Sequence, residues 1–276
     1  MLAGKLGVSL GKWSGICAHD RHATLARAAM LTCDIWEATG GKMNLRNAAA
    51  LITGGSSGIG RAIAESLASS GARVAITGRD KRRLEEAAQS MKAVPIVADV
   101  SKESDVERTY REVFKEFGEL DILVNNAGVG VFKSLVDFDR ASFESVFATN
   151  VTGAMLMARE AAKHFISRQR GNIVNISSTA SLRGAPNGTA YYASKFALRG
   201  MAECWRAELR RYNVRVLLIN PSEVLTNFAA NAGLSQKENP SKLRAQEIAY
   251  IVKAALEMDD RGFIPELSVF ATNPKD

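Results

Sequence analysis

From Met43 onward, short apolar runs alternate with amphipathic segments, and this alternation constrains the fold more than any other feature of the sequence. Each apolar run is followed by Gly, Asn, Asp, Ser or Pro, which is typical of strands buried on both faces. Between the runs the spacing is helical: Ile59, Ile63 and Leu67 share one face, and Gly71 is placed to end that helix. The pattern predicts βαβ units around a parallel sheet, with strands at residues 49–54, 73–78, 94–99, 120–128, 171–178, 214–221 and 262–271.

Composition agrees with one globular α/β domain, since 46% of the 276 residues are hydrophobic and 24% are charged. The net charge of +7 raises the alternative of a nucleic-acid binder. The positive charges are scattered, however, and residues 79–86 mix both signs as a solvated helix face does. We therefore expect no nucleic-acid partner, and a basic balance also suits an anionic cofactor. No apolar run approaches the roughly 18 residues that a membrane span needs, so we expect no membrane association.

The cysteine content bears on metal binding and on the cellular compartment. Cys17, Cys33 and Cys204 are an odd number without the spacing of metal ligands. They predict neither a disulfide framework nor a metal site, and they favour a reducing compartment. We therefore expect a cytoplasmic protein that holds no metal.

Residues 1–42 differ from the rest of the chain. They hold two of the three cysteines and two of the three tryptophans, and their apolar residues follow no sustained period. We interpret them as a disordered extension or an artefact of start-codon choice. A targeting segment is the alternative, although Asp20, Asp34 and Glu37 are unusual in a transit peptide. The folded domain is predicted at residues 43–276.

The stretch TGGSSGIG, residues 53–60, lies between the first expected strand and the first expected helix. Glycines in such a turn let the backbone approach a pyrophosphate, whose charge the free N–H groups and the helix dipole stabilise. The stretch is no Walker loop, because no Gly-Lys-Ser/Thr follows. A purely structural turn is the alternative, which the βαβ context disfavours. We predict that this turn binds a cofactor through Gly54, Ser56, Ser57, Gly58, Ile59 and Gly60.

The end of the second expected strand bears on which dinucleotide is bound. A free ribose 2′-hydroxyl favours an acidic residue here. The chain instead has Gly78 and then Arg79, whose planar guanidinium can hold a 2′-phosphate. The residues therefore favour NADP(H) over NAD(H), with a solvated Arg79 as the alternative.

Beyond the glycine-rich turn, the sequence contains DV at 99–100, NNAG at 125–128, ATNVTGA at 148–154, NISS at 175–178, YYASK at 191–195 and NPSEVLT at 220–226. On these motifs, the sequence from about residue 43 to its end resembles the short-chain dehydrogenase/reductase family of Rossmann-fold, NAD(P)-dependent oxidoreductases, in particular the 3-oxoacyl-acyl-carrier-protein reductases. The resemblance implies a single, doubly wound domain with seven parallel strands and helices on both faces. It also implies a homodimer or homotetramer built through two long helices.

The resemblance further implies roles for individual residues. Asp99 and Val100 would hold the adenine, and the NNAG segment would pack beneath the cofactor. The implied cofactor contacts are Asp99, Val100, Asn126, Ala127, Gly128, Tyr191, Lys195, Pro221, Val224 and Thr226. Two positions depart from the family pattern: Ser222 follows Pro221 where relatives commonly have glycine, and Ser57 stands where many NADPH-preferring relatives have a basic residue.

Tyr191 and Lys195 are four residues apart, so on a helix both project from one face. A phenol titrates near pH 10 in model peptides, about three units above neutral. A nearby ammonium and the positive nicotinamide of an oxidised cofactor would favour the phenolate, so we expect the pKa of Tyr191 to be lowered. We therefore predict Tyr191 as the general acid or base and Lys195 as a ligand of the nicotinamide ribose. The neighbouring Tyr192 is interpreted as a packing residue.

Two further residues complete the predicted catalytic set. Ser178 ends an expected strand, where ligands collect in open α/β sheets, and its hydroxyl can donate to a substrate oxygen. The resemblance adds Asn150, which would help a water connect Lys195 to solvent. The reaction implied is reversible hydride transfer between C4 of NADPH and a carbonyl carbon, with a 3-oxoacyl thioester or a small ketone as substrate. A catalytically silent NADP-binding regulator is the alternative. Residues 227–243 are expected to form a short lid with Phe228 and Leu234 as apolar contacts.

Overall fold

The structure, a computed structural model, describes residues 43–234 and 239–273. Residues 1–42, which were interpreted above as an extension, lie outside this part of the chain. The last residues of the predicted domain also lie outside it.

Seven strands form one sheet in the order β3-β2-β1-β4-β5-β6-β9, and every pairing in it is parallel. The strands are β1 (Ala49–Ile52), β2 (Arg73–Gly78), β3 (Val94–Val97), β4 (Ile122–Asn125), β5 (Gly171–Ile176), β6 (Val214–Pro221) and β9 (Glu266–Val269). Each lies within one of the seven expected runs, so the predicted parallel sheet is confirmed. The chain leaves β1 toward one edge and returns to place β4 on its other side. The topological switch point, where open α/β sheets bind ligands, therefore lies between β1 and β4.

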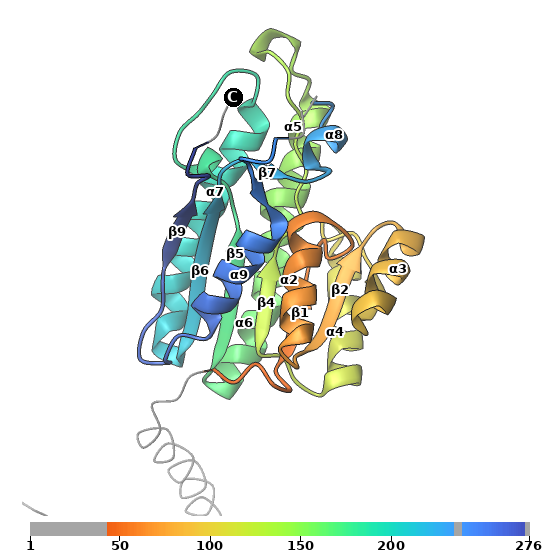
Figure 1. Ribbon diagram of the computed structural model, residues 1–276, viewed down its shortest axis with the longest axis vertical. Helices are drawn as coiled ribbons and strands as arrows, with labels where there is room; N and C mark the ends of the chain where they lie inside the picture. Colours follow the sequence, from red (N-terminus) through yellow and green to blue (C-terminus); the bar gives the residue numbers. More distant parts are fainter. Residues whose placement is uncertain (1–42, 235–238, 274–276) are drawn as a thin grey trace, which may run out of the picture. The chain divides into compact units, whose positions relative to one another are not determined.

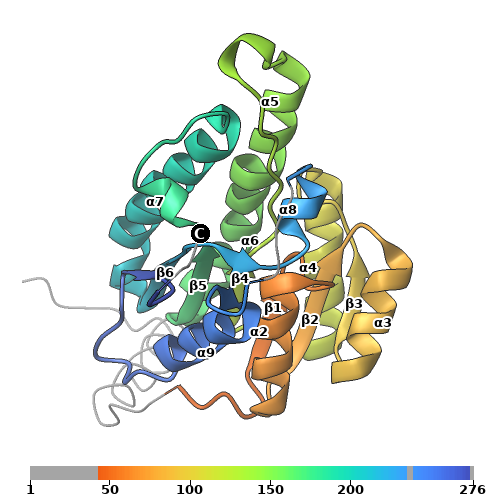
Figure 2. The same cartoon turned by 45° about the horizontal axis from the view of Figure 1, so that its top comes forward.

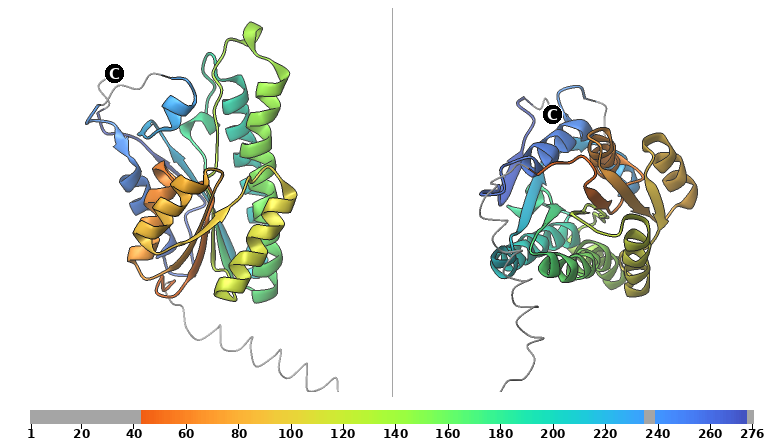
Figure 3. Two further views of the ribbon diagram at one scale, coloured as in Figure 1. Left: turned by 90° about the vertical axis from the view of Figure 1, so that its right-hand side faces the viewer. Right: turned by 90° about the horizontal axis from the view of Figure 1, so that it is seen from below.

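Helices cover both faces of the sheet, as predicted (Figures 1 and 3). One face packs against α2 (Gly58–Ser69), α3 (Lys81–Met91) and α9 (Ala245–Leu256). The other packs against α4 (Glu103–Phe117), α6 (Ala154–Arg168) and α7 (Thr189–Leu209). Because side chains alternate along a strand, Leu51 points to the second group of helices and Ile52 to the first.

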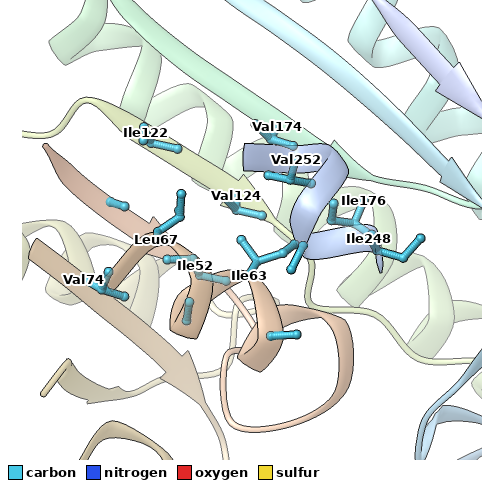
Figure 4. Packing of buried hydrophobic residues seen from close by; sticks show 14 of the residues in the cluster. Ile52, Ile63, Leu67, Val74, Ile122, Val124, Val174, Ile176, Ile248 and Val252 are labelled. Atoms are coloured by element: carbon cyan, nitrogen blue, oxygen red, sulfur yellow. The ribbon is translucent and has the colours of Figure 1, made fainter. Parts of the chain in front are cut away.

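Helix α2 shows how the core holds the turn before it in place. Ile63 and Leu67 are fully buried in the cluster around Ile52 and Val124 (Figure 4). Burying each such side chain contributes about 1.5 to 3 kcal/mol. Past the end of the helix, Gly71 has a φ of +89°, so it takes the left-handed conformation expected of it. The start of α2 is thus fixed against the end of β1, where the glycine-rich turn lies.

Shorter elements lie beyond the carboxyl ends of the strands (Figure 2). They are α5 (Arg140–Phe147), α8 (Phe228–Asn231) and a two-stranded pair of β7 (Val224–Leu225) with β8 (Leu243–Arg244). A π-helical segment at Ala148–Gly153 joins α5 to α6, and single 3-10 turns occur at Leu135–Asp137, Thr179–Ser181 and Arg210–Tyr212. Apart from the Arg210–Tyr212 turn, which precedes β6 at the opposite edge, these elements surround the edge of the sheet at which the predicted site residues lie.

The charged stretch interpreted as a solvated helix face forms the start of α3. Lys81 pairs with Glu85 at 3.8 Å and Arg82 with Glu86 at 3.3 Å, all on exposed side chains. This mixed-sign face agrees with the interpretation. Within residues 43–234 and 239–273, no helix is long and apolar enough to cross a membrane.

Candidate active site

A cavity of about 670 Å³ lies at the carboxyl ends of the central strands, beside the switch point. It brings together segments far apart in sequence: the glycine-rich turn, the loops after β2 to β6, and the start of α7. Every predicted catalytic or cofactor-binding residue lines it except Gly60 and Asn150. The structure therefore brings these residues together at one cavity, and Gly60 and Asn150 lie outside its lining.

The glycine-rich turn has the backbone that its sequence predicted. Gly54 and Gly58 have φ angles of +65° and +55°, in the left-handed region that glycine favours. A methyl group at Gly60 would lie 2.3 Å from the Asn126 side-chain nitrogen and 2.5 Å from the Gly54 carbonyl oxygen. Gly60 thus permits α2 to pack closely against the loop after β4. The Ser57 side chain does not cap α2, which leaves the first-turn N–H groups available to an anion.

Thr53 ties the turn after β1 to the loop after β4. Its hydroxyl accepts hydrogen bonds from the backbone N–H groups of Asn126 (2.9 Å) and Ala127 (3.0 Å). In return, the Asn126 side-chain amide donates to the carbonyl oxygens of Thr53 (2.9 Å) and Gly54 (3.2 Å). The motif containing Thr53 was recognised from the sequence, but this linking role depends on a pairing of two loops more than seventy residues apart.

The loops after β2 and β3 form the charged end of the cavity. Arg79 lines this end and is exposed, and Arg83, from the first turn of α3, lines it as well. Arg83 was not predicted, although it follows Arg79 by four residues; it lies 3.9 Å from Asp80. Asp99 also lines the cavity, and its carboxylate accepts hydrogen bonds from the backbone and hydroxyl of Ser101 at 3.0 and 2.7 Å.

The residues present fit a dinucleotide. Among the described residues, the Thr77 and Ser177 hydroxyls are buried without a hydrogen-bond partner, and both residues line the cavity. A ligand with many hydroxyl and phosphate oxygens can satisfy them. The glycine-rich turn and the uncapped start of α2 can bind a pyrophosphate, and Arg79 and Arg83 can bind a further anion. By contrast, no cluster of three potential metal ligands occurs among the described residues.

Lys195 is buried beneath Tyr191 on α7. Its side-chain nitrogen donates a hydrogen bond to the Ile176 carbonyl oxygen at 3.0 Å and lies 5.7 Å from the centre of the Tyr191 ring. The residue is only 6% exposed. Burial disfavours the charged ammonium and lowers the pKa of Lys195 to about 8.

The pKa of the Tyr191 phenol is higher than the sequence suggested. Burial raises the pKa of its phenol to about 12, although a hydrogen bond with the Ser178 side chain acts in the opposite direction. The expected lowering is not found, because desolvation outweighs the other contributions and the Lys195 ammonium is directed at Ile176. At neutral pH the phenol of this structure keeps its proton and can act as a donor.

Ser178 and Asn150 occupy different places relative to the cavity. Ser178 lines it beside Tyr191, and its oxygen also accepts a hydrogen bond from the Ala180 N–H at 3.1 Å. Asn150 belongs to the π-helical segment and lies behind the wall. Its side chain bonds both the N–H and the carbonyl of Val129 at 2.9 Å and donates to the Ser194 hydroxyl at 2.9 Å. In this structure Asn150 therefore braces the loop after β4 against α7.

Aromatic rings flank the Tyr191 phenol. The ring centres of Phe132 and Phe228 lie 5.5 and 5.4 Å from that of Tyr191, and Leu234 also lines the cavity. Phe228 and Leu234 were the expected apolar contacts. Phe132 was missed, because nothing local marks a phenylalanine in the loop after β4 as a site residue. Within the expected lid, residues 235–238 lie outside the described part of the chain.

The chain is also similar to known proteins in sequence and in structure. The sequence model of the short chain dehydrogenase family matches residues 48–243. L-xylulose reductase of Caenorhabditis elegans is 35% identical over 216 residues, which cover 76% of this chain and 83% of that protein.

Two solved structures are also similar. The 3-ketoacyl-(acyl-carrier-protein) reductase of Brucella melitensis, complexed with NADH, has a TM-score of 0.78 at 29% identity, over 83% of this chain and 98% of that one. A metagenomic short-chain oxidoreductase in complex with NADP has a TM-score of 0.73 at 32% identity, over 84% and 100% of the two chains.

Proposed function

Because the chain belongs to the short-chain dehydrogenase/reductase family and is an NAD(P)-dependent oxidoreductase, we propose that it interconverts a carbonyl and a secondary alcohol with NADP(H). The observation that carries the proposal is the convergence of three groups on one cavity: the Tyr191 phenol, the Ser178 hydroxyl bonded to it, and the Lys195 ammonium one helical turn away. The proposed catalytic residues are therefore Ser178, Tyr191 and Lys195, with Asn150 in support.

Each of these residues has a defined task in carbonyl reduction. When bound, NADPH supplies the hydride for the carbonyl carbon. Ser178 donates a hydrogen bond to the carbonyl oxygen and stabilises the negative charge that builds there. Tyr191 gives its phenolic proton to the same oxygen, for which a protonated phenol is the required form. In the reverse direction Tyr191 accepts the proton from the alcohol.

Lys195 supports Tyr191 through its charge. With a pKa of about 8, the ammonium is mostly protonated at neutral pH and stabilises the phenolate that remains after proton transfer. We also assign two further roles to Lys195, which are to bind the nicotinamide ribose and to help return a proton from solvent. Asn150 fixes Val129 and Ser194 and so keeps α7 in register with the loop beneath the substrate.

We further propose that the protein prefers NADP(H) over NAD(H). This preference is supported by Arg79 and Arg83, two cations at the end of the cavity where a 2′-phosphate of a bound dinucleotide would lie. Solved relatives carry either NADH or NADP, so the preference depends on this chain's own residues.

We also propose a homodimer or homotetramer. Phe196 on α7 is 44% exposed, and Phe270, just after β9, is 60% exposed. Large apolar side chains on an outer surface favour burial against a second copy. Light scattering of the purified protein tests this, with a monomer as the contradicting result. The cytoplasmic location stays a prediction from the cysteine content.

The reaction is tested by measuring oxidation of NADPH in the presence of ketones, after binding of NADPH has been established by fluorescence titration. We expect turnover of at least one neutral ketone and a lower Michaelis constant for NADPH than for NADH. Tight binding of NADPH without turnover of any ketone or alcohol would instead support the catalytically silent regulator.

A further inference from the structure

We propose that the cavity selects a neutral ketone with an aromatic ring next to its carbonyl, and that Gly130, Phe132 and Phe228 set this selection. The inference rests on the proposed function, because it concerns the substrate of the same site. It follows from how two phenyl rings converge on Tyr191 and from where the charges of the cavity lie.

Phe132 and Phe228 come from segments far apart in sequence. Phe132 belongs to the loop after β4, and Phe228 begins α8 after β7. Their rings are tilted by 47° and 48° to the Tyr191 ring, and both residues line the cavity. A tilted arrangement at about 5.5 Å is favourable for aromatic pairs, and the half-buried Phe132 and Phe228 can offer the same contact to a further ring in the cavity. A ring attached to the reacting carbonyl would therefore be bound beside the proton donor.

Gly130 allows this convergence. A methyl group at this position would lie 2.8 Å from Cε2 of Phe132 and 2.9 Å from Cζ of Phe228. Both rings thus approach the same glycine backbone. Gly130 is not among the glycines with positive φ, so its backbone is one that alanine can adopt. The absence of a side chain matters here for the placement of the two rings and not for the conformation of the loop.

The charges of the cavity point to a neutral substrate. Four of its charged lining residues, Arg79, Asp80, Arg83 and Asp99, belong to the loops after β2 and β3 and to the first turn of α3. Near Tyr191, Lys195 is buried against the Ile176 carbonyl, and Glu223 is paired with Lys242 at 2.7 Å. Among the described residues that line the cavity, none on the aromatic wall of Phe132 and Phe228 is a cation that could pair with a substrate carboxylate beside the reacting carbonyl. Its desolvation would be uncompensated.

Three matched ketones test the selection, each with the full chain and saturating NADPH. 1-Phenyl-1,2-propanedione carries a ring beside its carbonyls, 2,3-butanedione has a methyl group in place of the ring, and phenylglyoxylate has a carboxylate in place of the acetyl group. We expect kcat/KM for the phenyl diketone to exceed that of each of the other two by about tenfold or more.

Substitutions connect the selection to the residues. Phe132→Ala and Phe228→Ala should each bring the ratio of kcat/KM for the phenyl diketone over butanedione toward one. Gly130→Ala should do the same while removing no ring, because its methyl group displaces both. The matched controls are Tyr250→Ala, at an exposed ring outside the cavity, and Gly262→Ala, where a methyl group meets nothing within 4 Å. Both controls should keep the wild-type ratio.

The two substrates are measured on one preparation, so the ratio is independent of the fraction of enzyme that folds. A butanedione rate equal to or above that of the phenyl diketone would overturn the substrate class and leave the proposed function standing. Unchanged ratios in all three cavity variants would overturn the assignment to Gly130, Phe132 and Phe228. Binding of NADPH without turnover of any of the three ketones would count against the proposed function itself.

Discussion

The Lys195 side-chain nitrogen lies 5.7 Å from the centre of the Tyr191 ring and donates its hydrogen bond to a backbone carbonyl, that of Ile176. The pair therefore consists of a buried cation and a buried phenol without a direct hydrogen bond. Burial acts on the two in opposite directions: it lowers the pKa of Lys195 to about 8 and raises that of Tyr191 to about 12. Both shifts favour the neutral forms.

The lowered pKa of Lys195 predicts a pH-dependent stability of the cofactor-free protein. A lysine in the unfolded chain titrates near pH 10.4, so from about pH 8 to about pH 10 the unfolded state binds more protons than the folded state. The free energy of unfolding should therefore rise with pH over this window through Lys195. The full difference in pKa corresponds to about 3 kcal/mol.

Urea midpoints of the wild type and of Lys195→Met measure this contribution. The wild type should gain stability relative to the variant as the pH increases from about 8 to about 10. Tyr191 has a raised pKa and acts in the opposite sense only above about pH 10, so the window isolates the lysine. Parallel pH profiles for the two proteins would show that Lys195 titrates normally.

Arg79→Ala should weaken the use of NADPH far more than that of NADH. A charge-assisted hydrogen bond is worth about 1.5 to 3 kcal/mol, so the Michaelis constant for NADPH should rise about 10- to 100-fold. The constant for NADH should stay nearly unchanged, because NADH has no 2′-phosphate. Arg82→Ala is the control: its side chain is 85% exposed and does not line the cavity. If Arg79→Ala raised the Michaelis constants for NADPH and NADH equally, Arg79 would not contact the 2′-phosphate.

Gly60→Ala should destabilise the fold as well as the cofactor site. One of its close contacts is the Gly54 carbonyl oxygen, a backbone atom that cannot rotate away as a side chain can. Overpacking of this kind costs about 1 to 3 kcal/mol or more, measured as the free energy of unfolding in urea. In Gly262→Ala the new methyl group meets nothing within 4 Å, so this control should unfold like the wild type. Similar stabilities of the two variants would contradict the packing described for α2.

The features predicted correctly from the sequence are those that depend on local patterns of residues. The seven strands were found because each is a short apolar run closed by a turn residue, and Gly71 was placed correctly because a helix end has its own signal. The predicted site residues come together for a related reason, since parallel strands bring their carboxyl ends to one edge.

Features that depend on distant parts of the chain were missed. Phe132 reaches the cavity only because its loop returns over Tyr191, and Arg83 only because α3 begins where it does. The burial that raises the pKa of Tyr191 was not expected, because spacing along a helix shows a neighbouring cation but not how deeply the phenol is buried. The π-helical segment that holds Asn150 behind the wall likewise has no signal in the pattern of apolar residues.

The most direct measurement compares turnover of NADPH and a ketone by Tyr191→Phe and Tyr192→Phe. Both variants lose one phenolic oxygen, but only Tyr191 shares a hydrogen bond with Ser178, whereas the Tyr192 ring packs over Gly188. We expect Tyr191→Phe to keep its fold and NADPH binding while turnover falls by about 10²- to 10⁴-fold or more, and Tyr192→Phe to keep most of its rate. An inactive Tyr192→Phe beside an active Tyr191→Phe would contradict this expectation, together with the roles proposed for Ser178 and Lys195.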